Sequence, residues 1–299
     1  MKIKHFLVPI FLVALTIVFA FVNCSLNKGN SSYSRFEIKP SQTDSSISIA
    51  NDPHLVLYNP KTNQGKLMVY LPGTGGIAAK GPEDYFNTVV EQGYKLISLS
   101  YNDEISVAEI CSGHNLRVDS NCAEEFHWRR IYGEGPFSKI DDQAQDAIIP
   151  RLIKLLEYLM KTDKKGNWKY YIKDGKLRWR DIAFSGQSQG GGMAEFIAKH
   201  QSVYRIISFS GGWDWSLHGR IANWYSSGNA TPAEVWYSTY NVKETNGNVL
   251  LKQYKSIGIP SGHIYAFDLP VSKDRTPHTD GIRNTAYKAK WIEMLGRGN

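Results

Sequence analysis

Short runs of apolar residues alternate with amphipathic segments along most of this 299-residue chain. The apolar runs are nearly continuous, as in strands that are buried on both faces of a parallel sheet. The pattern predicts strands at residues 66–71, 95–101, 181–185, 204–210, 234–240 and 263–269, and helices at 83–92, 142–160, 189–200, 247–257 and 282–295. Strands and helices in alternation predict an α/β fold, with a mostly parallel central sheet flanked by helices.

The amino terminus follows a different pattern. Lys2 and Lys4 precede an uncharged run at residues 6–22, and Cys24 follows in the sequence FVNCS. A basic start and an apolar run are typical of an export signal, so we expect residues 1–24 to be a leader. FVNCS is similar to a bacterial lipoprotein box, in which Cys24 becomes the lipidated first residue. A cleaved ordinary signal and an uncleaved anchor are the alternatives. All three predict an exported protein, either a membrane-tethered lipoprotein or a periplasmic or extracellular protein.

Residues 25–50 are rich in Ser, Asn and Lys and poor in large apolar side chains. This composition predicts a flexible tether from the membrane to the folded domain. Within the tether, only residues 33–38 favour a strand. We expect one domain at residues 51–299, because no internal repeat or linker interrupts the pattern.

Cys111 and Cys122 are the only cysteines of that domain. An exported protein can keep disulfides, so we expect the two to bridge and to staple an irregular insertion at about 102–136, beside the cleft. The pair lacks CxxC spacing, which argues against a zinc site.

Composition and charge exclude several classes of function. At 42% hydrophobic and 21% charged residues, the chain is typical of globular proteins. Lys and Arg exceed Asp and Glu by 35 to 28, a net charge of +7, but the excess is spread along the chain. Without a basic block it predicts a solvated surface and no nucleic-acid partner. No dinucleotide fingerprint, phosphate loop or metal-ligand cluster is present, so we expect no cofactor and no metal.

The sharpest motif is GQSQG at residues 186–190, which an apolar strand enters and a helix leaves. This is the pattern of a nucleophile elbow, with Ser188 on a tight strand-to-helix turn. The positions two before and two after the serine must be small because strand and helix nearly touch there, and Gly186 and Gly190 meet that need. At a helix N-terminus, backbone N–H groups and the helix dipole stabilise an oxyanion.

On these residues the chain, from about residue 54 to 296, resembles the α/β-hydrolase superfamily in its secreted esterase and lipase branch. The sequence LPGTGG at residues 71–76 follows a strand where that family has its oxyanion loop. The resemblance implies that the backbone N–H groups of Gln189 and Thr74 stabilise the oxyanion. It also implies the order nucleophile, acid, histidine, with His278 as the base because it lies in a polar loop after the last strand.

Two carboxylates are candidates for the acid that orients His278. The family most often has it after the second strand beyond the elbow, where Glu244 is the first carboxylate. Asp214 lies one strand earlier, at a position that some members use, and Asp274 is a weaker third choice. The neighbouring Trp213 and Trp215 either form an apolar or sugar-stacking wall of the substrate pocket or hold down a long loop.

Together these features predict an exported serine hydrolase that cleaves carboxylic esters, small or polymeric, through an acyl-enzyme. Two alternatives remain. One is a non-catalytic, surface-tethered binding protein on a hydrolase scaffold, because a fold alone does not establish chemistry. The other is an acyltransferase, in which an acceptor other than water takes the acyl group.

Overall fold

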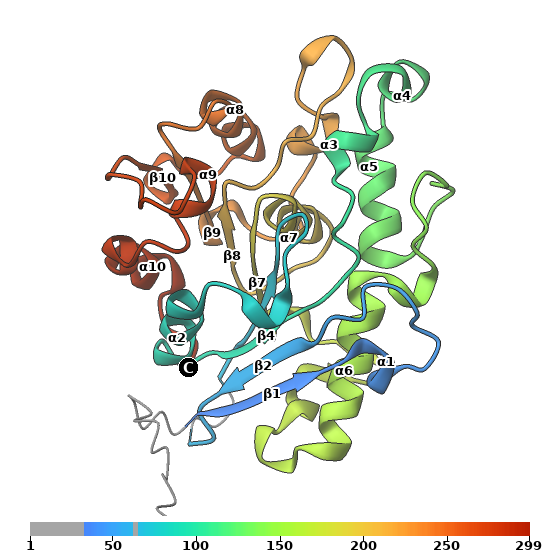
Figure 1. Cartoon of the computed structure of the whole chain (residues 1–299), viewed down its shortest axis with the longest axis vertical. Coiled ribbons are helices and arrows are strands. Elements are labelled where there is room, and N and C mark those ends of the chain that lie inside the picture. Colours follow the sequence, from blue (N-terminus) through green and yellow to red (C-terminus); the bar gives the residue numbers. More distant parts are fainter. Residues whose placement is uncertain (1–32, 62–64) are drawn as a thin grey trace, which may run out of the picture. The chain divides into compact units, whose positions relative to one another are not determined.

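The computed structural model describes residues 33–61 and 65–299, which contain an eight-stranded sheet (Figure 1). The strands are, in spatial order, β1 (Ser34–Ile38), β2 (His54–Tyr58), β4 (Lys95–Ser98), β3 (Leu67–Leu71), β7 (Ile182–Gln187), β8 (Ile206–Phe209), β9 (Trp236–Asn241) and β10 (Ile264–Phe267). β2 is antiparallel to both of its neighbours, and all the other neighbouring pairs are parallel. The predicted mostly parallel sheet is therefore confirmed.

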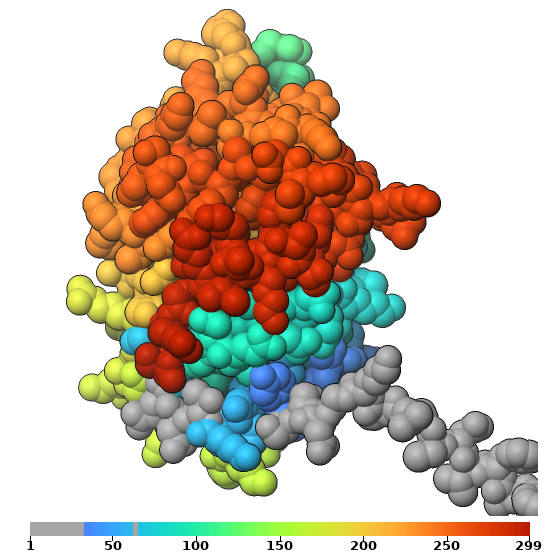
Figure 2. Space-filling model, turned by 90° about the vertical axis from the view of Figure 1, so that its left-hand side faces the viewer, coloured from blue at the N-terminus to red at the C-terminus, as the bar shows by residue number. Residues whose placement is uncertain are grey.

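Helices cover both faces of the sheet because its side chains alternate between two apolar cores. On β3, Leu67 and Val69 enter one core while Met68 and Tyr70 enter the other. The first core is covered by α6 (Ile148–Thr162), α7 (Gln189–His200) and α8 (Gly247–Ile257), and the second by α2 (Glu83–Glu91) and α10 (Lys288–Leu295). Figure 2 shows the segment of α10 lying against that of α2 on the molecular surface.

The apolar pattern located most elements to within a few residues. It missed β2, although every residue of that strand is buried. The helix expected from residue 142 begins only at Ile148, after a 3-10 turn, Ala144–Asp146. Pro150 accounts for the later start, because it has no N–H and its ring would clash with the carbonyl of residue 146 in a helix that began at 142. Two aspartates of this stretch are instead buried in ion pairs: Asp142 with Arg130 at 2.6 Å, and Asp146 with Arg151 at 3.2 Å.

The insertion at 102–136 is more regular than its sequence predicts. It contains α3 (Val107–Ile110), α4 (Gly113–Val118), α5 (Cys122–His127) and a π-helical turn, Trp128–Tyr132. The expected disulfide joins Cys111, at the end of α3, to Cys122, at the start of α5. Phe126 and Ile131 are fully buried in the apolar core. The insertion is thus a packed part of the domain.

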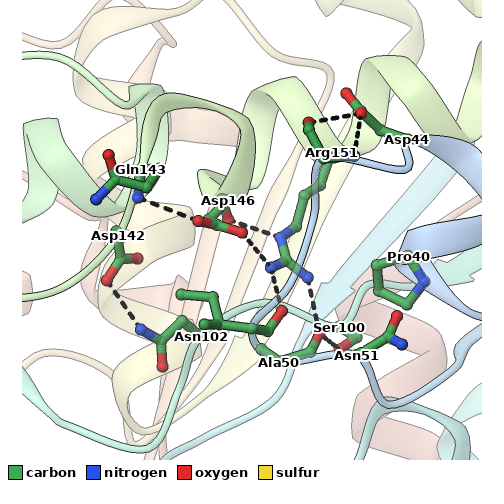
Figure 3. Close-up of polar contacts among 12 residues, drawn as sticks. Pro40, Asp44, Ala50, Asn51, Ser100, Asn102, Asp142, Gln143, Asp146 and Arg151 are labelled. Atoms are coloured by element: carbon green, nitrogen blue, oxygen red, sulfur yellow. Dashed lines mark hydrogen bonds and ion pairs between the residues drawn. The ribbon is translucent and has the colours of Figure 1, made fainter.

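The segment assigned to a tether is folded from Tyr33 onward, because β1 pairs with β2 and belongs to the same compact unit as the rest of the sheet. Arg151 of α6 secures the end of this segment (Figure 3). Its guanidinium donates to the carbonyl oxygens of Ile49 and Ala50, each at 2.8 Å, besides pairing with Asp146. The domain therefore includes residues 33–50, which the sequence placed outside it.

The predicted leader at residues 1–24, with Cys24, lies outside the described residues. In the part of the chain that is described, none of the helices combines the length and the apolar character that crossing a bilayer requires.

Candidate active site

Ser188 occupies a strained turn between β7 and α7. Its backbone has φ 53° and ψ −123°, a region that costs an L-residue free energy. A Cβ atom at Gly186 would lie 2.3 Å from the Gly190 carbonyl carbon, and one at Gly190 would lie 2.1 Å from the Leu71 carbonyl oxygen. The two glycines are therefore required by the close approach of β7, α7 and the end of β3.

A histidine and a carboxylate meet beside this turn. His278 lies on α9 (Pro277–Asp280), a one-turn helix after β10, where the sequence predicts a loop. Its Nδ1 is 3.0 Å from Oε2 of Glu244, which follows β9. Ser188 and His278 line one pocket, with no hydrogen bond between their side chains among those found in the described residues. Three distant parts of the chain are thus brought to the carboxyl edge of the sheet.

The Glu244 carboxylate is buried and fixed by several donors. The Ser210 hydroxyl donates to Oε1 at 2.5 Å, and the Asn241 N–H donates to the same atom at 2.9 Å. Burial alone would raise the pKa of Glu244, but the hydrogen bonds from His278, Ser210 and Asn241 outweigh it and hold the pKa below its ordinary value. Glu244 is therefore ionised at neutral pH, facing the imidazole.

Asp214, the competing acid, has a different partner. Its Oδ2 lies 2.5 Å from Nε2 of His127, and Trp224 Nε1 donates to the same oxygen at 2.8 Å. His127 is a residue of the insertion and is stacked on Phe196, with ring centroids 4.7 Å apart. All these side chains are buried. Asp214 thus joins the insertion to the loop after β8 and forms no hydrogen bond to His278 among those found in the described residues. The sequence offered no sign of the His127 contact, because the two residues are 87 positions apart.

The two predicted oxyanion donors are held together by side chains. Gln189 Nε2 donates to Thr74 Oγ1 at 3.4 Å and to the Asp103 carbonyl at 3.1 Å. The N–H groups of Gly75 and Gly76 also donate to Asp103, to its carbonyl and its carboxyl group. Among the described residues, the N–H groups of Thr74 and Gln189 themselves have no hydrogen-bond partner. Two unpaired donors next to Ser188 are what an oxyanion requires.

The pocket that contains Ser188 and His278 has a volume of about 350 Å³. Trp213 does not line it but packs edge-on against the His278 ring, with centroids 5.3 Å apart. Trp215 lines a separate cavity next to Cys111, and no residue of the insertion lines the Ser188 pocket. The region described contains no cluster of three or more His, Cys, Asp or Glu side chains suited to a metal ion.

Behind the elbow, α7 buries a carboxyl group that has no role in this pocket. Burial raises the pKa of Glu195 from 4.5 to about 8. Because folding raises this pKa, Glu195 stabilises the protein fully below about pH 4.5, and that stability is lost as the pH rises toward 8. Glu195→Gln removes the titration. The free energy of unfolding of the variant, relative to that of the wild type, should therefore increase by about 3 kcal/mol between pH 4.5 and pH 7.

Urea unfolding at the two pH values measures this difference. The matched control is Glu157→Gln, which removes an exposed carboxylate from the surface of α6. It should shift the unfolding free energy by the same small amount at both pH values. If Glu195→Gln behaves like this control, Glu195 is not the buried titrating group.

Three kinds of comparison were made with known proteins. No family model matches the chain, and no curated protein sequence matches it. Among solved structures, it is similar to a bacterial heroin esterase (TM-score 0.47, 12% identity, covering 91% of this chain and 86% of that one). It is also similar to dienelactone hydrolase from Anabaena variabilis (TM-score 0.46, 13% identity, 88% and 98%) and to EstE5, which was soaked with p-nitrophenyl butyrate (TM-score 0.44, 13% identity, 90% and 84%).

Similarity at this level carries no argument, so fold, activity and substrate have to be argued from this chain's own residues and strand order. The strand order, the two antiparallel pairings at one end of the sheet and the elbow after β7 together make up the α/β-hydrolase fold.

Proposed function

We propose that the protein is a serine hydrolase that cleaves carboxylic esters. One observation carries the proposal: Ser188, strained at the elbow, lines the same pocket as His278, and Nδ1 of His278 contacts the buried Glu244. A serine hydroxyl is a weak nucleophile until a base takes its proton, and the base needs a third group to orient it. These three side chains supply the nucleophile, the base and the orienting group.

In the proposed reaction, Nε2 of His278 accepts the hydroxyl proton while Ser188 Oγ bonds to the ester carbonyl carbon. Glu244 holds the proton on Nδ1 and stabilises the imidazolium that forms. The negative charge on the carbonyl oxygen is stabilised by the N–H groups of Gln189 and Thr74. The alcohol leaves with the proton from His278, and an acyl-enzyme remains. A water that gives its proton to His278 then releases the acid and restores Ser188, so the cycle requires no cofactor.

A fluorophosphonate probe tests the nucleophile directly. We expect the folded protein to gain the mass of one probe, on the peptide that contains Ser188, because only an activated serine attacks phosphorus at neutral pH. Ser188→Ala and the urea-unfolded wild type should remain unlabelled. A folded wild type without label would instead favour a binding protein on a hydrolase scaffold.

We further propose that the protein is exported and attached to a membrane through its amino-terminal leader or a lipid on Cys24. The pattern of residues 1–24 and the Cys111–Cys122 disulfide support this, because disulfides persist in oxidising compartments. The mass of the first peptide of the mature protein distinguishes a lipidated Cys24 from a plain cleaved end or an intact Met1. An intact start in a cytoplasmic fraction would contradict export.

A further inference from the structure

The pocket around Ser188 presents positive charge without a carboxylate to balance it. Lys80 enters from the oxyanion side, at the end of the 3-10 turn Ala78–Lys80, and Arg283 enters from the segment after α9. No Asp or Glu is among the described residues that line the pocket. The two cations lie some 200 positions apart in the chain and line the same cavity.

The Arg283 guanidinium lacks an ion-pair partner among residues 33–61 and 65–299. The carboxylate nearest to it in sequence is Asp280, and both of its oxygens already accept hydrogen bonds. One accepts the Ser272 N–H at 3.1 Å, and the other accepts Asn284 Nδ2 at 2.9 Å. Among the described residues, neither Arg283 nor Lys80 forms an ion pair or donates a side-chain hydrogen bond. A partly buried guanidinium thus brings five unused N–H donors to the pocket.

The Tyr70 phenol lies close enough to feel the positive charge of Arg283. Tyr70 also lines the pocket, and burial raises the pKa of its phenol, while the positive charge of Arg283 opposes that rise. The carboxyl group of Asp103 acts in the opposite sense, but it does not line the pocket and is bound to the Gly76 N–H behind the loop. The guanidinium therefore has a phenol nearby and no anion in the cavity.

We propose that the pocket selects esters that carry a second, anionic group, a carboxylate, with Arg283 as the specificity-determining residue and Lys80 supporting it. This rests on the proposed ester hydrolysis at Ser188. A guanidinium binds a carboxylate through two parallel hydrogen bonds, which are about twice as strong as those between neutral groups. A neutral acyl chain offers the guanidinium no such acceptor. The cavity of about 350 Å³ suits a short substrate, such as a half-ester of a small dicarboxylic acid.

Two pairs of esters of matched shape test the proposal. Monomethyl succinate is compared with methyl levulinate, which replaces the carboxylate of the acyl part by an acetyl group. Acetoxyacetate is compared with acetoxyacetone, which does the same in the alcohol part. We expect the wild type to prefer the anion by at least about tenfold in kcat/KM for one of the pairs, equivalent to about 1.4 kcal/mol. The pair that shows the preference identifies the part of the ester that Arg283 binds.

Arg283→Gln should bring that ratio to within about threefold of one, while Arg283→Lys keeps part of the preference. Any loss common to both esters of a pair cancels in the ratio. The matched control is Arg275→Gln, a cation of the preceding loop that does not line the pocket, and it should keep the wild-type ratio. A wild-type ratio near one for both pairs, or a ratio unchanged in Arg283→Gln, overturns the proposal.

Failure of the proposed function would look different. It would appear as no hydrolysis of any of the four esters together with no fluorophosphonate label on Ser188. In that case titration calorimetry with succinate tests the pocket by itself. Binding that is lost in Arg283→Gln and kept in Arg275→Gln supports the anion site, and equal binding to all three proteins, or none to the wild type, rejects it.

Discussion

Ser188→Ala is expected to reduce the kcat for p-nitrophenyl acetate by at least about 10³-fold, to the level of residual catalysis by the oxyanion donors. The change removes one oxygen atom and keeps the Cβ atom, so the elbow has the same backbone constraint as before. The urea midpoint should therefore change little. Release of p-nitrophenol, corrected for the uncatalysed reaction, measures the first effect, and loss of fluorescence with urea measures the second.

A serine on the same strand provides the matched control. Ser185 is buried three residues before Ser188, and its hydroxyl lies 3.0 Å from the Tyr85 hydroxyl. Ser185→Ala should cost about 1 kcal/mol of stability through the lost hydrogen bond, without a matching loss of kcat. Wild-type turnover in Ser188→Ala would remove Ser188 from the mechanism. A large loss in both variants would mean that the strand, not the nucleophile, was disturbed.

Glu244→Gln is expected to lower kcat by about 10²- to 10⁴-fold with little change in the shape of the site. The amide keeps the size of the carboxylate but carries no charge. It can present an N–H to Nδ1 of His278, which stabilises the wrong tautomer, and it cannot stabilise the imidazolium. Steady-state kinetics with p-nitrophenyl acetate measure the loss, which should fall on kcat rather than on KM.

Asp214→Asn is the comparison that decides which carboxylate is the acid. It should keep kcat within a few-fold of the wild type, because Asp214 contacts His127 and Trp224 instead of His278. Its cost should appear in stability, about 1–3 kcal/mol, as two buried donors lose a charged acceptor. The reverse result, a large loss of kcat in Asp214→Asn and a small one in Glu244→Gln, would assign the acid to Asp214.

The parts of this fold that the sequence predicts best are those set by local contacts. GQSQG signals the elbow because the close approach of β7 and α7 restricts Gly186 and Gly190 directly. Continuous apolar runs signal buried strands for the same reason. By contrast, α6 starts later than its apolar pattern suggests: Asp142 pairs with Arg130 of the insertion, and Asp146 pairs with Arg151 of α6 itself.

Features that depend on contacts between distant parts of the chain could not be predicted from the sequence. The choice between Glu244 and Asp214 depends on which histidine each one meets, and Asp214 meets His127 through the packing of the insertion against α7. Arg283 and Lys80 are some 200 positions apart, and each alone looks like an ordinary surface cation. Their shared cavity exists only once β3 and β10 have taken their places in the sheet.

Both ends of the described chain lie at the edge of the sheet away from Ser188. β1 runs parallel to β4, because each of them is antiparallel to β2, so Tyr33 lies at the edge where the parallel strands begin. The other end is fixed to the same edge, since the carbonyl of Gly298 accepts the Lys66 N–H just before β3. Attachment to a bead, a resin or a sensor surface at Tyr33 or near Gly298 would leave the pocket facing solution. The domain is thus suited to immobilisation at this edge of the sheet, with the pocket left accessible from solution.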